Sequence, residues 1–262
     1  VFQYSRDHYS IDGLVNLSLS RFKQHWVTLV LVFGAAFALI YAMSIVGGVL
    51  LPWLYSDLFE ETAFGFPTHP LVWLLQAGQL VVQTALQLML LGLCLDVLQS
   101  HDVSAARALA RVQRLPAALV QMLLIYAVIG LVGGAGAGLA WSVLSFGEQA
   151  GLWLTIGLGV LVAVPLVYYG LGIMFGMAEL VVDPACGPME AMRRSLALME
   201  GKRMSGMWVV LVSSIIAAAG FVACCVGALA SLPVSLLVFC SLFLALRNPT
   251  PHASTHTVDF PV

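Results

Sequence analysis

The chain has 262 residues, of which 61% are hydrophobic and only 9% are charged, and its formal net charge is -2 at neutral pH. Soluble domains carry roughly 25% charged residues, so this composition excludes an ordinary water-soluble protein and indicates a membrane as the solvent. The near-zero net charge argues against a nucleic-acid partner, which would require a clustered excess of Lys and Arg.

Apolar segments long enough to cross a bilayer recur along the chain, and a helical crossing takes about 20 residues. The predicted spans are 26–51, 71–98, 115–146, 152–182 and the two halves of 207–246. We expect the last stretch to fold back as a hairpin marked by Gly227 and Pro233, because it is too long for one crossing. We expect no signal peptide, since the first apolar run is too long.

These spans define the predicted fold class. It is all-α: a polytopic membrane bundle of six transmembrane helices, with one membrane domain over 1–250 and a short cytoplasmic tail at 251–262. Basic residues occur on one side of the bundle only. They are Arg6, Arg21, Lys23, Arg107, Arg111, Arg114, Arg193, Arg194, Lys202, Arg203 and Arg247. Because basic loops stay in the cytoplasm, this pattern predicts an even number of spans with both termini cytoplasmic, as in a bacterial inner membrane protein.

Three basic segments also have the pattern of short interfacial amphipathic helices. They are 10–25, 104–114 and 188–199, and in the third a helix is expected to begin at Pro188 and to stop at Gly201. Their basic residues are candidate contacts for lipid headgroups: Arg107, Arg111, Arg114, Arg193, Arg194, Lys202 and Arg203.

The order of these segments predicts a three-fold internal repeat of one interfacial helix followed by a hairpin of two spans. The units are 10–98, 103–182 and 188–247. The alternative is that the basic segments are ordinary linkers whose side chains reach toward the headgroups, as in many membrane proteins.

The third unit carries a motif with a resemblance to a known family. The chain reads Met177-Ala-Glu-Leu-Val-Val-Asp-Pro, then Gly187-Pro-Met-Glu-Ala-Met-Arg-Arg-Ser, and continues into a long apolar hairpin. This resembles a signature of uncharacterised bacterial six-helix membrane proteins, which include the YciC-like proteins and the membrane domain of some glycerophosphodiester phosphodiesterases. The residues that match are Glu179, Glu190, Ala191 and Ser195. The resemblance is specific over 177–246, and it implies a membrane domain without the catalytic activity of the fused members.

Glutamines form a polar stripe on the second span. Gln76, Gln79, Gln83 and Gln87 fall within an arc of about 80° on a helix, and Gln121 on the third span is a further member of this candidate site. Because an unpaired amide is costly in hydrocarbon, the stripe must face other helices or a wet cavity. It therefore predicts either hydrogen bonds between helices or a water-lined path for a substrate or a lipid.

Glycines on the third and fourth spans form a second pattern. Gly130, Gly134 and Gly138 follow one another at intervals of four residues, and Gly172 and Gly176 do the same on the fourth span. Small residues at this spacing let helices approach closely. They predict helix-packing faces within the bundle or against a neighbouring subunit, the alternative being a flexible gate.

Ionisable residues within the predicted spans are scarce. Asp96 and Glu179 are the carboxylates found there, and we expect them to pair with Arg107, Arg193 or Arg194. Metal-ligand spacings, catalytic motifs and phosphate-binding glycine loops are lacking, so we predict no enzyme activity, no cofactor, no metal site and no catalytic residue.

Together these patterns predict a non-enzymatic scaffold or accessory subunit. Its expected partners are membrane lipids and another membrane protein or a second copy of the chain, with no nucleic acid. The alternative is a transporter or lipid-handling permease that uses the polar face of the second span.

Overall fold

The computed structural model describes residues 11–47, 70–99, 105–144, 148–183, 185–222 and 225–247. The described residues contain six helices that are long and apolar enough to cross a membrane, which confirms the predicted all-α class with six spans. The long helices are α1 (Ile11–Ile45), α3 (Pro70–Leu98), α5 (Leu115–Leu144), α6 (Glu148–Ile173), α9 (Arg203–Val222) and α10 (Cys225–Arg247).

Shorter helical segments precede or follow the long ones. They are α4 (Ala105–Ala110), the 3-10 helix η4 (Arg111–Arg114), α7 (Gly176–Val182) and α8 (Pro188–Leu198). Within α1, His25 has non-helical backbone angles and separates an initial helical part from the apolar part. Each of the three hairpins therefore follows a helical segment in the chain, as the order of the sequence patterns predicts.

The turn between the last two spans differs from its predicted position. Because α9 ends at Val222 and α10 begins at Cys225, Gly227 and Pro233 both lie inside α10. This division gives 20 residues to α9 and 23 to α10, so that each helix is long enough for one crossing. The helix therefore continues through Pro233, since a turn at this residue would leave too few residues after it for a second crossing.

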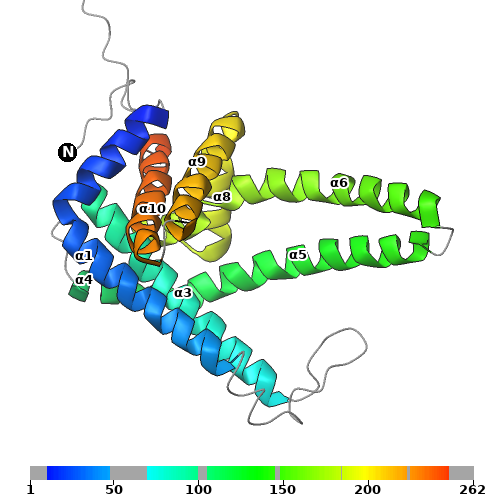
Figure 1. Ribbon diagram of the computed structural model, residues 1–262, viewed down its shortest axis with the longest axis horizontal. Helices are drawn as coiled ribbons and strands as arrows, with labels where there is room; N and C mark the ends of the chain where they lie inside the picture. The colour runs from blue at the N-terminus through cyan, green and yellow to red at the C-terminus, as the bar shows by residue number, and fades with distance from the viewer. Residues whose placement is uncertain are drawn as a thin grey trace, which may run out of the picture.

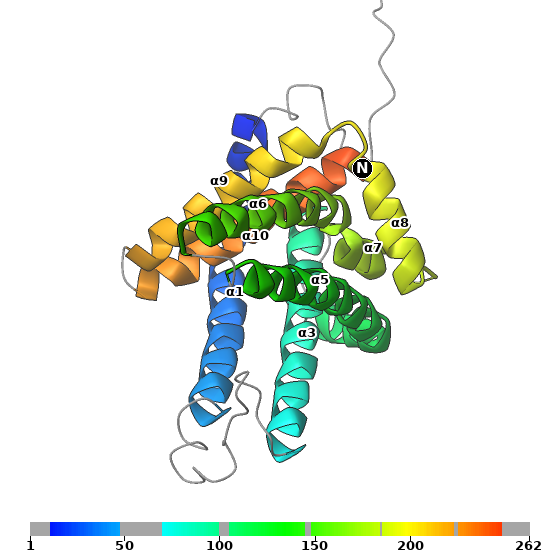
Figure 2. The same ribbon diagram turned by 90° about the vertical axis from the view of Figure 1, so that its right-hand side faces the viewer.

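The three hairpins diverge from a shared base. Figures 1 and 2 show α1 with α3, α5 with α6, and α9 with α10 leading away from that base in different directions. The base is called here the basal junction, and it comprises residues 91–99, 107–121, 172–183, 185–199 and 237–247. In it the ends of α3, α7 and α10 meet η4, α8 and the start of α5.

The hydrophobic core is built around α10, which packs against α1, α3 and α9. Of the most apolar stretch of α10, 61% is buried inside the chain, against 11% for the span Arg107–Gly134, which holds the first part of α5. A helix that is apolar on all sides is suited to a central position, because every face meets another helix. Phe175 of the basal junction contacts two rings of α10, Phe239 and Phe243, at centroid distances of 4.9 and 5.5 Å.

Where the burial of α5 and α6 is described, these two helices have little cover from their own chain. Leu131 is 74% exposed and Leu161 is 69% exposed, and Figure 1 shows both helices extending beyond the rest of the molecule. In a bilayer such faces contact lipid or another protein.

Candidate functional site

The centre of the basal junction is the break between α6 and α7. Here the Ser195 hydroxyl of α8 donates a hydrogen bond to the Gly172 carbonyl at 2.7 Å and accepts one from the Phe175 amide at 3.1 Å. These are backbone groups that the interrupted helix leaves without their usual partners. Because Ser195 and Phe175 are fully buried, the hydroxyl takes the place that a water molecule would fill at an exposed break.

One face of α8 packs against the break between α6 and α7. Ala191, Ser195 and Met199 succeed one another at four-residue intervals, and all three are fully buried. Pro188 occupies the first turn, and Gly201 has a φ of +71° just beyond the end of the helix. The helix therefore begins at the expected residue, Pro188, and ends at Leu198, shortly before the expected stop at Gly201.

An ion-pair network holds the outer side of α8. The guanidinium of Arg194 donates to Asp183 at 2.6 Å and to Glu190 at 3.1 Å, and the Ala185 amide donates to the same aspartate at 3.0 Å. The hydrogen bond from Arg194, reinforced by that amide, holds the pKa of Asp183 below its usual range. The two carboxylates in turn raise the pKa of Arg194, with Asp183 contributing most.

The two carboxylates within the spans are both paired with arginines, as a carboxylate in a span requires. Asp96 lies 2.7 Å from Arg111, and Glu179 lies 3.7 Å from Arg247. The prediction that Glu179 pairs with Arg193 or Arg194 is wrong because Glu179 is on the buried side of α7, which faces the end of α10. Arg194 is already held by carboxylates on the outer side of α8.

Gly92 explains how Arg111 reaches Asp96. A side-chain carbon placed on Gly92 would overlap the guanidinium of Arg111, so the arginine lies directly on the backbone of α3. The carboxylate of Asp96 is almost fully buried, whereas 17% of the Arg111 side chain is exposed. The pair thus fixes the orientation of Arg111 at the edge of the junction.

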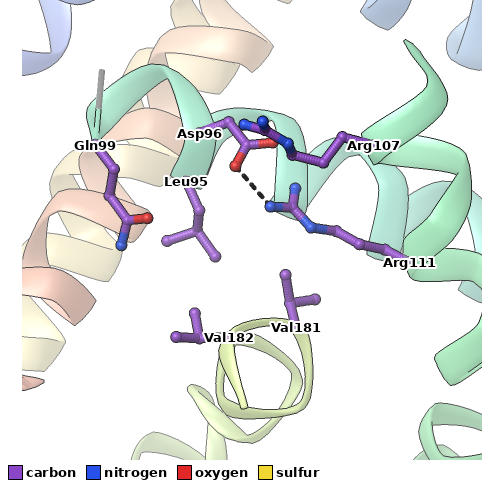
Figure 3. A pocket seen from close by; sticks show the side chains of 7 residues that line it. All are labelled: Leu95, Asp96, Gln99, Arg107, Arg111, Val181 and Val182. Carbon is purple, nitrogen blue, oxygen red and sulfur yellow. Dashed lines mark hydrogen bonds and ion pairs between the residues drawn. The ribbon is translucent and has the colours of Figure 1, made fainter. Parts of the chain in front are cut away.

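A pocket of about 290 Å³ opens beside this pair. Its lining residues come from α3, α4, η4 and α7, and they are Leu95, Asp96, Gln99, Arg107, Arg111, Val181 and Val182. Figure 3 shows the two arginines reaching from one side toward Asp96, with Gln99 across from them and the two valines on the helix below. The pocket is therefore cationic on one side and apolar on the other.

The predicted glutamine stripe is not gathered into one enclosed site. Gln76 and Gln87 are exposed and Gln79 and Gln83 are half-buried, and within the described residues none of these amides forms a hydrogen bond. Gln121 lies apart from them, fully buried against Gly176 of α7, and its two amide atoms have no hydrogen-bond partner in the described structure.

The predicted glycine faces have two different environments. Gly172 is closely covered by Leu196, as Gly176 is by Gln121, so a larger side chain at either position would overlap a neighbour. By contrast, nothing lies within 4 Å of where a side chain would begin at Gly130 and Gly134. Gly138 lies in α5, but its surroundings are outside the described residues.

The basic residues predicted to meet headgroups differ in their exposure. Arg107, Arg193 and Lys202 are exposed, and Arg111, Arg114 and Arg194 are half-buried. Arg203 is also half-buried, and its guanidinium lies 3.5 Å from the centroid of the Tyr168 ring, within cation–π distance. Sequence reasoning missed the roles of Gly92 and Asp183, because each role depends on an arginine brought to it by another helix.

The described part of the chain contains no group of three or more His, Cys, Asp or Glu side chains placed to hold a metal ion. Comparison of the chain with protein-family models, with curated proteins and with solved structures finds no match. The structure and composition identify the chain at the level of a polytopic membrane protein.

Proposed function

We propose that the chain is a non-enzymatic membrane scaffold or accessory subunit that binds lipid and another membrane protein or a second copy of itself. The observation that carries this proposal is the exposed glutamine face of α3. Gln87 lies near the middle of the helix, is exposed, and has no hydrogen-bond partner among the described residues.

The free-energy cost of an unpaired amide in the membrane favours a second helix that pairs with the glutamine face. An amide in hydrocarbon without a hydrogen bond costs several kcal/mol, whereas an amide that meets another polar side chain across a helix interface is stabilising by about 1 kcal/mol. A glutamine amide both donates and accepts, so the face is complementary to a second polar helix face. The open surfaces of α5 at Gly130 and Gly134 offer a further place where a neighbouring helix can approach closely.

The proposed orientation of the protein in its membrane is based on the distribution of its basic residues. The basal junction contains most of the basic residues, and the positive-inside pattern supports a cytoplasmic location for it, in a bacterial inner membrane. The resemblance to the YciC-like proteins supports the same proposal. Of its four matching residues, Glu179, Ala191 and Ser195 are buried in the junction, and the exposed Glu190 binds Arg194 on the outer side of α8.

A permease remains the alternative function, because a row of glutamines suits a polar path. Such a path requires the amides to line an enclosed space. Gln76 and Gln87 are exposed on the outside of the single chain, so a path of this kind would have to form between subunits.

The test is extraction of the native protein into nanodiscs, followed by intact-complex mass spectrometry. A protein partner or a second copy at fixed stoichiometry is the expected result. Recovery as a single chain would refute the scaffold proposal, and flux of a retained small molecule would favour the permease.

A variant pair sharpens this test. Gln87→Leu removes the mid-span amide and should weaken assembly by about fivefold, since one amide pair contributes about 1 kcal/mol. Gln113→Leu makes the same chemical change at an exposed position of η4, outside the α3 face, and should leave assembly unchanged. Equal effects of the two variants would contradict the assignment of the interface to α3.

A further inference from the structure

We propose that the glutamine face of α3 pairs with the same face of a second copy of this chain, with the two α3 helices parallel and in register. This inference deepens the proposed function and rests on it, because it names the partner that the exposed glutamines require. The spacing of the residues along α3, their exposure and the common orientation of all copies in a membrane lead to this partner.

The residues of this face follow one another along α3 in alternating steps of four and three. They are Gln76, Leu80, Gln83, Gln87 and Leu90, and they are called here the α3 seam. At 100° per residue they lie within an arc of about 80°. This is the heptad spacing of helices that cross at about 20° and interlock along one narrow line. The spacing therefore indicates that the α3 seam packs against another helix.

The α3 seam is open in the single chain. Its five side chains are exposed or half-buried, and the amides of Gln76, Gln83 and Gln87 form no hydrogen bond within the described part of the chain. Gln79 lies to one side of the seam, with its amide oxygen 4.0 Å from the place where a side chain on Gly47 would begin. Figures 1 and 2 show the first half of α3 beside α1 and leading away from α5, α6 and α9. A helix of another chain therefore has access to the seam.

The orientation of the protein in its membrane favours a second copy as the source of that helix. Because the positive-inside rule gives every copy the same orientation, the α3 helices of two neighbouring copies run parallel. Two-fold symmetry about the membrane normal then sets each seam residue against the same residue of the other copy. Glutamine meets glutamine at three levels, and a glutamine amide both donates and accepts hydrogen bonds. The polar groups of the seam are therefore complementary to themselves.

The glutamines also define the register of the pair. Gln76 and Gln87 are about 17 Å apart along the helix, which is roughly half of a hydrocarbon core of about 30 Å. A shift of one copy by a single turn would set Gln76 against Leu80 and leave amides unpaired in hydrocarbon, which is costly. A polar residue at a heptad position fixes the register of helix pairs in the same way.

Disulfide cross-linking in native membranes tests this pairing. Gln76→Cys and Gln87→Cys each place one thiol on the seam, and a disulfide requires two Cα atoms within about 7 Å of each other. Leu74→Cys is the matched control, because Leu74 is 70% exposed on the opposite side of α3. The wild type reports any cross-link through the native cysteines. After oxidation with copper phenanthroline, we expect the mass of each seam variant to double, whereas Leu74→Cys and the wild type stay monomeric.

A mixed experiment tests the register. Gln76→Cys and Gln87→Cys are expressed together on copies with different tags, and the mixed disulfide is measured. Parallel pairing in register predicts that no mixed disulfide forms, because the two thiols are about 17 Å apart along the helix axis. A mixed disulfide as abundant as the symmetric ones would overturn the proposed register.

The other outcomes are equally decisive. Monomer from both seam variants would refute the seam as an interface, and equal cross-linking of Leu74→Cys would mean chance collision in the membrane. A cross-link from the seam to a different protein would refute the second copy and leave the scaffold proposal standing. Failure of the scaffold proposal has a separate readout, which is recovery of a single chain in nanodiscs.

Discussion

The hydroxyl of Ser195 offers the most direct test of how the basal junction is held together. Ser195→Ala removes the hydrogen bond donated to the Gly172 carbonyl at 2.7 Å and the one accepted from the Phe175 amide at 3.1 Å. The methyl group of alanine fits the site but satisfies neither backbone group. Both groups then lie at a buried break in the helix, where water has no access because Ser195 and Phe175 are fully buried.

The magnitude follows from these two bonds. A buried hydrogen bond contributes about 0.5–1.5 kcal/mol, and measured values within membrane proteins lie near the lower end, so the loss of both predicts a decrease of about 1–3 kcal/mol in the free energy of unfolding. The assay is reversible unfolding of the full chain in mixed micelles with increasing SDS, followed by circular dichroism.

Ser214→Ala is the matched control, because it also deletes a serine hydroxyl that hydrogen-bonds to backbone. That hydroxyl donates to the Val210 carbonyl at 2.8 Å within its own helix and is exposed, so the expected change is within about 0.5 kcal/mol. The reasoning would be refuted if Ser195→Ala destabilised the protein no more than Ser214→Ala does.

Two further predictions concern the neighbouring ion pairs. Gly92→Ala should displace the guanidinium of Arg111 from α3 and destabilise the protein by about 1–3 kcal/mol, the usual cost of overpacking; the same SDS titration measures it, and wild-type stability would contradict the close contact. Asp183 has a lowered pKa in the folded state, so its ion pair with Arg194 stabilises α8 above the unfolded pKa of about 4, and this stability should be lost as the pH falls toward the folded pKa. Melting temperatures between pH 3 and pH 6, in the wild type and in Asp183→Asn, test this; equal slopes in both proteins below about pH 4 would count against it.

Much of the fold follows from the sequence, because the signals for it are local. The spans are visible as apolar segments of the length that a bilayer requires, and Pro188 and Gly201 mark the ends of α8 by their own backbone preferences. The turn between α9 and α10 was an exception, and so was the break between α6 and α7, which falls inside the predicted span 152–182. Pro233 is tolerated inside a helix whose length is set by the crossing.

The candidate site depends on which helix faces meet, and this is a property of the whole chain. The sequence indicated that Asp96 and Glu179 need cationic partners, since a carboxylate in a span is costly alone. Only the packing of η4 on α3 and of α7 beside α10 decided that these partners are Arg111 and Arg247. The pocket has the same origin, because its lining joins residues more than 80 positions apart, from Leu95 to Val182.

The same distinction applies to the glutamines and glycines. The sequence determined that Gln87 needs a partner and that Gly134 permits a close approach, because both follow from the side chain itself. Whether the chain supplies that partner was decided by the tertiary structure, in which Gly176 is covered by Gln121 while Gly134 stays open. The physical reason is that hydrophobicity places a helix in the bilayer without specifying its neighbours, and lipid competes equally for every apolar face.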